Sequence, residues 1–312
     1  MWQTSDRKLD LQLIIEEGGD CFQNFLLAAA RRTLPSRHKQ PREATLPDPA
    51  HIRDWTYNDI LCFSGKLKEE WRQACLEEIS ALKKCSVFEL VALPNGFKLI
   101  RNRYIFDIKS DGQKCACLVA KGFSQIKGIN YNELFSPVVW YESVRLLFAL
   151  ASLEQWHMQA VDVKTAFLYG KLDEELYMLQ PQGFLEKGKK KSVWRLNRAI
   201  YGLKQAGLAW WKELEASMKQ LGFTCCQSDA GIFFNKEYKI VVIAYVDDCL
   251  FIGKELKRVL QAKEVFMTIW ECQDLGEAKE FLRMRIRHEG CKLILDQQDY
   301  LDKIVKPSIC RH

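Results

Sequence analysis

The chain has 312 residues, of which 48% are hydrophobic and 28% are charged, and its formal net charge is +6. Its twelve cysteines form no paired C-x-x-C pattern of the kind that binds zinc. No apolar run approaches the roughly 18 residues that a membrane-spanning helix needs, and the polar start Met1–Arg7 does not have the pattern of a signal peptide. We therefore expect an ordinary globular protein that is intracellular, cytoplasmic or nuclear and not secreted, with reduced thiols and no membrane partner.

Residues 1–50 show little sign of a packed fold. Leu9–Ile15 and Phe22–Ala30 are short apolar runs that favour helices, whereas the basic stretch Arg31–Ala50 holds four of the eight prolines. Clustered prolines are typical of linkers. We expect a weakly organised leader and linker over residues 1–50.

The next segment predicts a helix followed by strands. Apolar residues recur at helical spacing over Glu69–Lys83, and Ser86–Val91 has the composition of a strand. Lys98–Lys109 and Cys115–Lys121 favour two further strands, joined by a hairpin turn at Ser110–Gly112.

The middle and end of the chain mix helices with strands. Helical stripes are expected over 141–155, 202–221 and 254–269, and strands over 156–168, within 174–194, and in a hairpin formed by 281–286 and 291–295. Because these elements do not alternate strictly, the expected fold class is α+β, an antiparallel sheet with helices on one face.

The stretch Val241–Gly253 predicts a tight hairpin with Asp247 and Asp248 at its tip, between two apolar runs that contain no basic residue. Adjacent carboxylates repel each other, and oxygen-only ligands favour Mg²⁺. Aspartate is also a common turn former, so an ordinary turn is the alternative. A third carboxylate, Asp162, lies in another strand-like run. Three carboxylates of this kind can hold two metals about 3.5–4 Å apart for in-line phosphoryl transfer.

Tyr245–Asp248, with the sequence Tyr-Val-Asp-Asp, resembles the catalytic signature of reverse transcriptases. Other phrases in family-like order narrow the resemblance to Ty1/copia-type retrotransposon polymerases: Leu118–Gln125, Phe135–Val139, Val161–Leu168, Gln180–Phe184, Tyr201–Ala206 and Asp274–Glu277. The match runs from about Trp71 to Tyr300. It implies the RNA-directed DNA polymerase domain of a retrotransposon Pol polyprotein, which transfers nucleotides from dNTPs to a primer 3′-hydroxyl.

The resemblance implies a right-hand polymerase fold over residues 51–305, with an antiparallel palm sheet packed on helices. Fingers are expected at about 66–155 and 179–206, and the palm at about 156–178 and 207–296. Residues 297–312 would begin a thumb. Since the sequence stops at His312, we expect a truncated copy with the thumb largely missing.

By the same resemblance, Asp162, Asp247 and Asp248 are the catalytic residues and the ligands of two Mg²⁺ ions, with Mn²⁺ as a substitute. Four residues would bind the incoming dNTP: Phe167, Gln205, Lys204 and Lys121. The Phe167 ring corresponds to the floor under the sugar that selects deoxynucleotides. The alternative for Phe167 is a simple core residue.

Primer and template contacts are expected from Tyr245, Lys189, Lys190, Lys191 and Arg195. The last four lie in Lys187–Lys204, a segment with seven basic residues and no acid. Such a run is either a solvated face or, beside a polymerase signature, a phosphate-facing surface. The implied partners are an RNA template, a DNA primer, their RNA–DNA hybrid and dNTPs; the oligomeric state is left open.

Several positions depart from the family pattern. Cys117 stands where an arginine is expected to clamp the triphosphate, and a thiol has no guanidinium fork. Trp140 replaces an arginine, Gly207–Leu208 replaces Pro-Arg, and Arg283 replaces a glycine. The alternative is therefore a catalytically inactive retrotransposon relic that at most binds nucleic acid. A two-metal nuclease or phosphatase would share the carboxylates but would not explain the other phrases.

Overall fold

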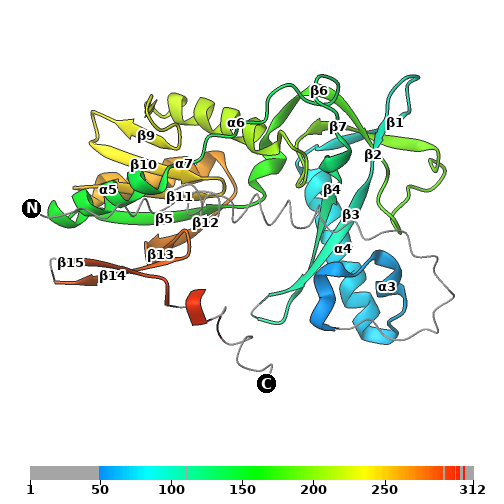
Figure 1. Cartoon of the computed structure of the whole chain (residues 1–312), viewed down its shortest axis with the longest axis horizontal. Helices are drawn as coiled ribbons and strands as arrows, with labels where there is room; N and C mark the ends of the chain where they lie inside the picture. The colour runs from blue at the N-terminus through cyan, green and yellow to red at the C-terminus, as the bar shows by residue number, and fades with distance from the viewer. Residues whose placement is uncertain (1–48, 110, 291, 299, 303–304, 306–312) are drawn as a thin grey trace, which may run out of the picture.

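The computed structural model describes residues 49–109, 111–290, 292–298, 300–302 and 305. Residues 1–48 of the expected leader and most of the segment expected to begin a thumb lie outside these described residues, whereas Pro49 and Ala50 begin η1. Figure 1 shows two groups of elements, one around a six-stranded sheet and one around the hairpin β3–β4 and helix α4.

The first half of the described chain contains the elements of the second group. Their bounds are η1 Pro49–Asp54, α3 Tyr57–Leu61, α4 Gly65–Lys84, β1 Phe88–Ala92, β2 Leu99–Ile100, β3 Asn102–Ile108, β4 Lys114–Ala120 and η2 Gly122–Ser124. The predicted helix over 69–83 is confirmed as α4. The predicted strand over 98–109 divides in two, because β2 pairs in parallel with β6 whereas β3 forms the hairpin with β4.

The remaining elements supply the six-stranded sheet and its neighbours. Their bounds are α5 Tyr141–Leu153, β5 His157–Val163, η3 Ala166–Tyr169, β6 Lys171–Met178, β7 Ser192–Arg198, α6 Ala206–Gln220, β8 Thr224–Cys225, β9 Ile232–Asn235, β10 Ile240–Tyr245, β11 Asp248–Gly253, α7 Leu256–Ile269, β12 Cys272–Glu277, β13 Glu280–Phe281, β14 Met284–Glu289 and β15 Lys292–Asp296. The three predicted helices are confirmed as α5, α6 and α7. The strand expected over 156–168 ends at Val163, because Thr165 adopts a positive φ and starts η3.

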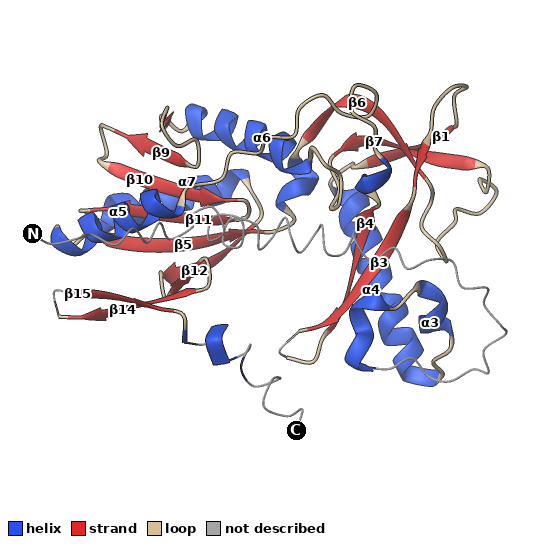
Figure 2. Ribbon diagram, viewed as in Figure 1, coloured by secondary structure: helices blue, strands red, loops and turns tan. Residues whose placement is uncertain are grey.

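The large sheet has the order β12-β5-β11-β10-β9-β8, with all neighbours antiparallel. Alternate residues of its strands enter two hydrophobic cores. Val161 and Val163 of β5 join a core with α6 and α7, whereas Met158 and Ala160 join a second core with α5, β13 and β14. The α+β class is therefore confirmed, but the expectation of helices on one face is wrong: both faces are covered (Figure 2).

Two elements pack across the subdomain boundaries expected from the sequence. Helix α5, expected in the fingers, contributes Val144, Phe148 and Ala151 to the second core of the six-stranded sheet. Strand β6, expected in the palm, instead pairs with β7 and β2 in a four-stranded sheet of order β1-β7-β6-β2. Within the described ranges, none of the helices is long and apolar enough to cross a membrane.

Candidate active site

The hairpin β10–β11 forms as predicted, but its tip differs by one residue. Tyr245 pairs with Asp248, so the two-residue turn is Val246–Asp247 and Asp248 is the first residue of β11. Val246 adopts a φ of +56°. Two-residue hairpin turns favour such left-handed backbone because its twist matches that of the strands.

Strand β5 brings the third carboxylate to the same place. Asp162 pairs in register with Asp248, and the Val163 N–H donates to the Asp247 carbonyl at 2.8 Å. Since Ala160 and Leu250 point into the second core, the alternation of strand residues places Asp162 and Asp248 on that same face. The predicted juxtaposition of the three aspartates is thus built into the backbone, although their separation in sequence is large.

The three carboxylates carry negative charge that nearby basic groups do little to balance in the described part of the chain. Burial raises the pKa of Asp248 to about 7, and the negative charges of Asp247, Asp162 and Glu280 add to this shift. Burial also raises the pKa of Asp247 and of Asp162, with Lys164 opposing the shift only at Asp162. Among described residues, none forms an ion pair with any of the three aspartates. Unbalanced negative charge of this kind favours the binding of a cation.

The chemistry of this donor set fits a divalent cation, since hard cations prefer carboxylate oxygens. The side chains themselves do not form a metal-binding cage. In the part of the chain that the structure describes, no group of three or more His, Cys, Asp or Glu is arranged to hold a metal ion. The backbone therefore brings the three aspartates close together as predicted, but their side chains are not positioned as the predicted metal-binding cage.

Phe167 lies close to the carboxylates but is only 5% exposed. Its ring packs edge-on against Tyr201, with the ring centroids 5.1 Å apart. The pKa of Tyr201 is raised by burial and, to a smaller extent, by Cys117, Asp247 and other acids including Asp162. Phe167 and Tyr201 are thus neighbours of the catalytic candidates, and the sugar-floor role of Phe167 stays a prediction.

Gln205 is 4% exposed and its amide is bonded to protein groups. Its Nε2 donates to the Asn130 carbonyl at 2.8 Å and to Glu174 Oε2 at 3.2 Å, and its Oε1 accepts from Gln125 Nε2 at 3.0 Å. These bonds fasten the loop after β4 to the start of α6. In this conformation the amide of Gln205 serves the fold, and its predicted contact with a nucleotide would require these bonds to rearrange.

The two lysines predicted to contact the dNTP differ in setting. Lys204 is exposed, and its Nζ donates to Tyr131 Oη at 3.1 Å while lying 4.7 Å from the Tyr131 ring centroid. Lys121 is half-buried, and its backbone N–H donates to the Arg101 carbonyl at 2.7 Å. Their predicted contacts with phosphate stay predictions.

The predicted primer and template residues fall in two places. Tyr245 lies at the end of β10, packed against the second core beside Asp248. The three lysines 189–191 are exposed in the connection between β6 and β7, and Arg195 on β7 pairs with Glu89 at 3.2 Å. The structure therefore brings Tyr245 to the carboxylates and places the basic run on the four-stranded sheet.

Glu280 is a neighbour of the site that the sequence did not indicate. It lies on β13, close enough for its charge to raise the pKa of Asp248. Its position depends on the small sheet β13-β14-β15 folding back onto the large one, with Phe281 and Met284 in the second core. Neither spacing nor composition could have signalled this contact.

Cys117 occupies the position where a triphosphate clamp is expected. The pKa of its thiol is raised by burial first and then by Glu78, to which the thiol is hydrogen-bonded. The Glu78 carboxylate also accepts the Leu118 N–H at 2.8 Å, and burial raises its pKa. The Glu78 carboxyl of α4 therefore faces position 117, where its hydrogen-bond partner is the Cys117 thiol.

Arg283 lies in the two-residue turn between β13 and β14, where Leu282 and Arg283 have φ values of +50° and +61°. A left-handed conformation costs a non-glycine residue about 1–2 kcal/mol, partly offset here by the contact of the guanidinium with the Tyr300 ring. We expect Arg283→Gly to raise the free energy of unfolding by about 0.5–1 kcal/mol. Urea unfolding of both proteins measures the change, and a loss of stability would show that the turn is not strained.

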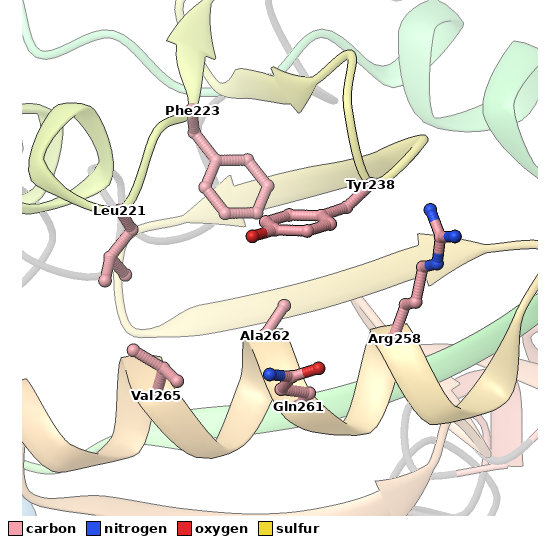
Figure 3. Close-up of a pocket in the computed structure, with 7 residues that line it drawn as sticks. All are labelled: Leu221, Phe223, Tyr238, Arg258, Gln261, Ala262 and Val265. Carbon is pink, nitrogen blue, oxygen red and sulfur yellow. The ribbon is translucent and has the colours of Figure 1, made fainter.

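An apolar cavity lies away from this site. It has a volume of about 170 Å³ and is lined by Leu221, Phe223, Tyr238, Arg258, Gln261, Ala262 and Val265 (Figure 3). Tyr238 precedes the first residue of β10, whereas Asp247 follows the last one. The cavity and the carboxylates are therefore at opposite ends of this strand.

Comparison with known proteins identifies the family of this chain. A family model described as reverse transcriptase (RNA-dependent DNA polymerase) matches residues 85–309. The Retrovirus-related Pol polyprotein from transposon TNT 1-94 of Nicotiana tabacum is 37% identical over 250 residues, which are 77% of this chain and 19% of that protein. The corresponding polyprotein from transposon RE2 of Arabidopsis thaliana is 36% identical over 253 residues, 77% of this chain and 17% of that protein.

A solved structure of the foamy viral protease–reverse transcriptase in complex with double-stranded DNA aligns with 76% of this chain and 37% of its own, at 13% identity and a TM-score of 0.42. The chain spans about a fifth of the length of the curated relatives named above. The family model covers well over half of the chain. The chain belongs to the reverse transcriptase (RNA-dependent DNA polymerase) family, in the Ty1/copia type found in retrotransposon Pol polyproteins.

Proposed function

We propose that this chain binds a DNA primer paired with an RNA template and extends the primer with deoxynucleotides. The observation that supports this activity is the pairing of Asp162 on β5 with Asp248 on one face of a sheet, with Asp247 in the adjoining β10–β11 turn and no ion pair to any of them from the described residues. Paired carboxylates on neighbouring strand ends suit two-metal nucleotidyl transfer.

Asp162 and Asp247 would be the principal ligands of the metals, and Asp248 would complete the anionic site. Two bound Mg²⁺ ions, or Mn²⁺ in their place, would lower the pKa of the primer hydroxyl and neutralise the charge of the triphosphate. The protein fixes the positions of these acids through the β5–β11 register and the bond from the Val163 N–H to the Asp247 carbonyl.

Binding of substrate would use the surroundings of the carboxylates. The Phe167–Tyr201 pair beside Asp247 offers an aromatic surface for the sugar of a dNTP, with Lys204 and Lys121 as phosphate contacts and Gln205 as a further contact. Tyr245, at the end of β10 next to the turn, would contact the primer end. The exposed lysines 189–191 and Arg195 offer charge for the hybrid backbone, which is recognised through phosphate and shape rather than through base sequence.

Primer extension on poly(rA)·oligo(dT) with Mg²⁺ or Mn²⁺ tests the activity. The matched control is Asp247→Asn/Asp248→Asn, with hybrid binding measured separately for both proteins. Extension by the wild-type chain that the double variant lacks supports the proposal. Equal binding of hybrid by both proteins with no extension by either would refute polymerase activity.

Cys117 favours a second candidate function, a relic that holds nucleic acid without copying it. The position expected to clamp the triphosphate presents a half-buried thiol hydrogen-bonded to Glu78, so this residue offers no cationic contact with phosphate. The loss of a charge clamp removes transition-state stabilisation. In this case the carboxylates would be a remnant of the family's chemistry.

The variant Cys117→Arg separates the two candidates. We expect it to lower the KM for dNTP about tenfold, because a guanidinium held by Glu78 can pair with phosphate in a bidentate way. Steady-state primer extension at varied dNTP concentration measures the change. Cys115→Arg, two residues earlier on β4, is the control and should leave KM unaltered. An unaltered KM in both variants would contradict the clamp.

A further inference from the structure

The turn that holds Asp247 is strained. Val246 has a φ of +56°, in the left-handed region that β-branched residues rarely occupy. The turn is bounded by the Tyr245–Asp248 pair, so any relaxation of Val246 would move the residues on both sides of it. A conformation of this kind persists only where the surrounding structure holds it in place.

The holding group is Trp210 of α6. Its indole Nε1–H donates to the Val246 carbonyl oxygen at 2.6 Å, and the side chain is 2% exposed. The next carbonyl, that of Asp247, accepts the Val163 N–H at 2.8 Å. Two consecutive carbonyls of the turn are thus anchored on different elements, Val246 on α6 and Asp247 on β5.

Trp210 is itself fixed by aromatic neighbours. The ring of Trp270 packs edge-on against it with centroids 5.1 Å apart, and Tyr169 lies 6.1 Å away. The Trp270 indole N–H is in turn bonded to Ser217 Oγ at 3.2 Å. A Cβ at Gly170 would lie 2.6 Å from the Trp210 backbone nitrogen, so glycine permits this close approach of the chain to α6. The indole therefore has little freedom to follow the turn if the turn relaxes.

We propose that Trp210 is a positioning residue for the metal site: its indole N–H holds Val246 in the left-handed conformation and so fixes the backbone from which Asp247 and Asp248 project. The inference deepens the proposed function and rests on these aspartates being the metal ligands. Substituting a residue that orients a metal ligand without itself binding the metal typically lowers metal affinity or activity by about 10–100-fold.

The test compares Trp210→Phe with Trp211→Phe. The control residue is the next tryptophan on the same helix, and its indole N–H donates to the Ala230 carbonyl at 3.0 Å, which is not part of the turn. Mn²⁺ binding is measured by electron paramagnetic resonance, and the φ of Val246 by NMR couplings and ¹³C shifts in the metal-free protein. We expect Trp210→Phe to weaken Mn²⁺ binding by about 10–100-fold and to move Val246 out of the left-handed region. Trp211→Phe should change neither.

A rescue sharpens the result. Glycine adopts positive φ without support, so Val246→Gly should restore much of the Mn²⁺ affinity lost in Trp210→Phe. A purely structural role of the tryptophan would not be relieved by a glycine in the turn. Should Trp210→Phe fail to fold, benzothienylalanine at position 210 removes the N–H while keeping the ring system.

The outcomes separate this inference from the proposed function. An unchanged φ of Val246, or an unchanged Mn²⁺ affinity, in the variant that lacks the N–H overturns the positioning role. If the wild-type chain has no Mn²⁺ binding that Asp247→Asn/Asp248→Asn removes, the proposed function fails. In that case the φ of Val246 still decides whether Trp210 holds the turn.

Discussion

Asp248→Asn is expected to make the metal-free chain more stable at pH 8 and to reduce its primer extension by about two to three orders of magnitude. Burial and three neighbouring acids raise the pKa of Asp248 from 3.8 to about 7. A group whose pKa is raised on folding contributes stability that is fully present below its unfolded pKa and is lost as the pH rises through its folded pKa. Between about pH 4 and pH 8 this loss amounts to at most about 4 kcal/mol.

Denaturant unfolding in EDTA across this pH range measures the effect. The stability difference between Asp248→Asn and the wild-type chain should grow with pH and should shrink when Mg²⁺ is added. Asp274→Asn is a control of opposite sign, because the hydrogen bond from Lys263 lowers the pKa of Asp274. The stability that Asp274 contributes is therefore present above its unfolded pKa of about 3.8 and lost as the pH falls below that value, so Asp274→Asn should gain no stability relative to the wild-type chain between about pH 4 and pH 8. A wild-type chain equally stable at pH 5 and pH 8 would show that folding does not raise the pKa of Asp248.

Lys263→Met is expected to destabilise the chain by about 1–3 kcal/mol, the cost of leaving a buried polar group without its partner. Lys263 lies on α7 with 4% of its surface exposed, and its Nζ donates to Asp274 Oδ1 at 2.7 Å and to Gln159 Oε1 at 3.0 Å. Removing the ammonium leaves the buried Gln159 amide without this donor, whereas the half-exposed Asp274 carboxylate keeps the hydrogen bond from the Gly276 N–H. It also frees the β12 bulge at Asp274–Gly276, next to the strand that contains Asp162.

Thermal and denaturant unfolding measure the loss, which corresponds to a fall in Tm of roughly 5 °C for a domain of this size. Lys257→Met is the matched control, because Lys257 is exposed on the same helix and should change stability by less than about 0.5 kcal/mol. Asp274→Asn in the Lys263→Met background should recover part of the stability by removing the unpaired charge. Equal stability of Lys263→Met and Lys257→Met would mean that the buried pair is dispensable.

Much of the local structure could be predicted from the sequence. The helices α4, α5, α6 and α7 have apolar spacing close to 3.6 residues, and the β10–β11 hairpin is marked by two apolar runs around two acids. These signals depend on near neighbours in the chain. The same locality explains the difference at the turn: the sequence pattern predicts it at Asp247–Asp248, whereas it lies at Val246–Asp247, because a β-branched residue such as Val246 carries no sequence signal for a positive φ.

The amino-acid sequence by itself determined the three aspartates as candidates and, through the phrases around them, the family. Only the tertiary structure decided that Asp162 pairs with Asp248 and that Trp210 donates to the Val246 carbonyl. It likewise decided that Lys263 bonds to Asp274 of β12 and that the Gln205 amide is bonded to Gln125. Each of these contacts joins residues that are distant in the chain or on separate elements. The order in which strands pair, and the face on which each helix packs, depend on burying the apolar side chains of all elements at once. Local spacing does not encode that choice.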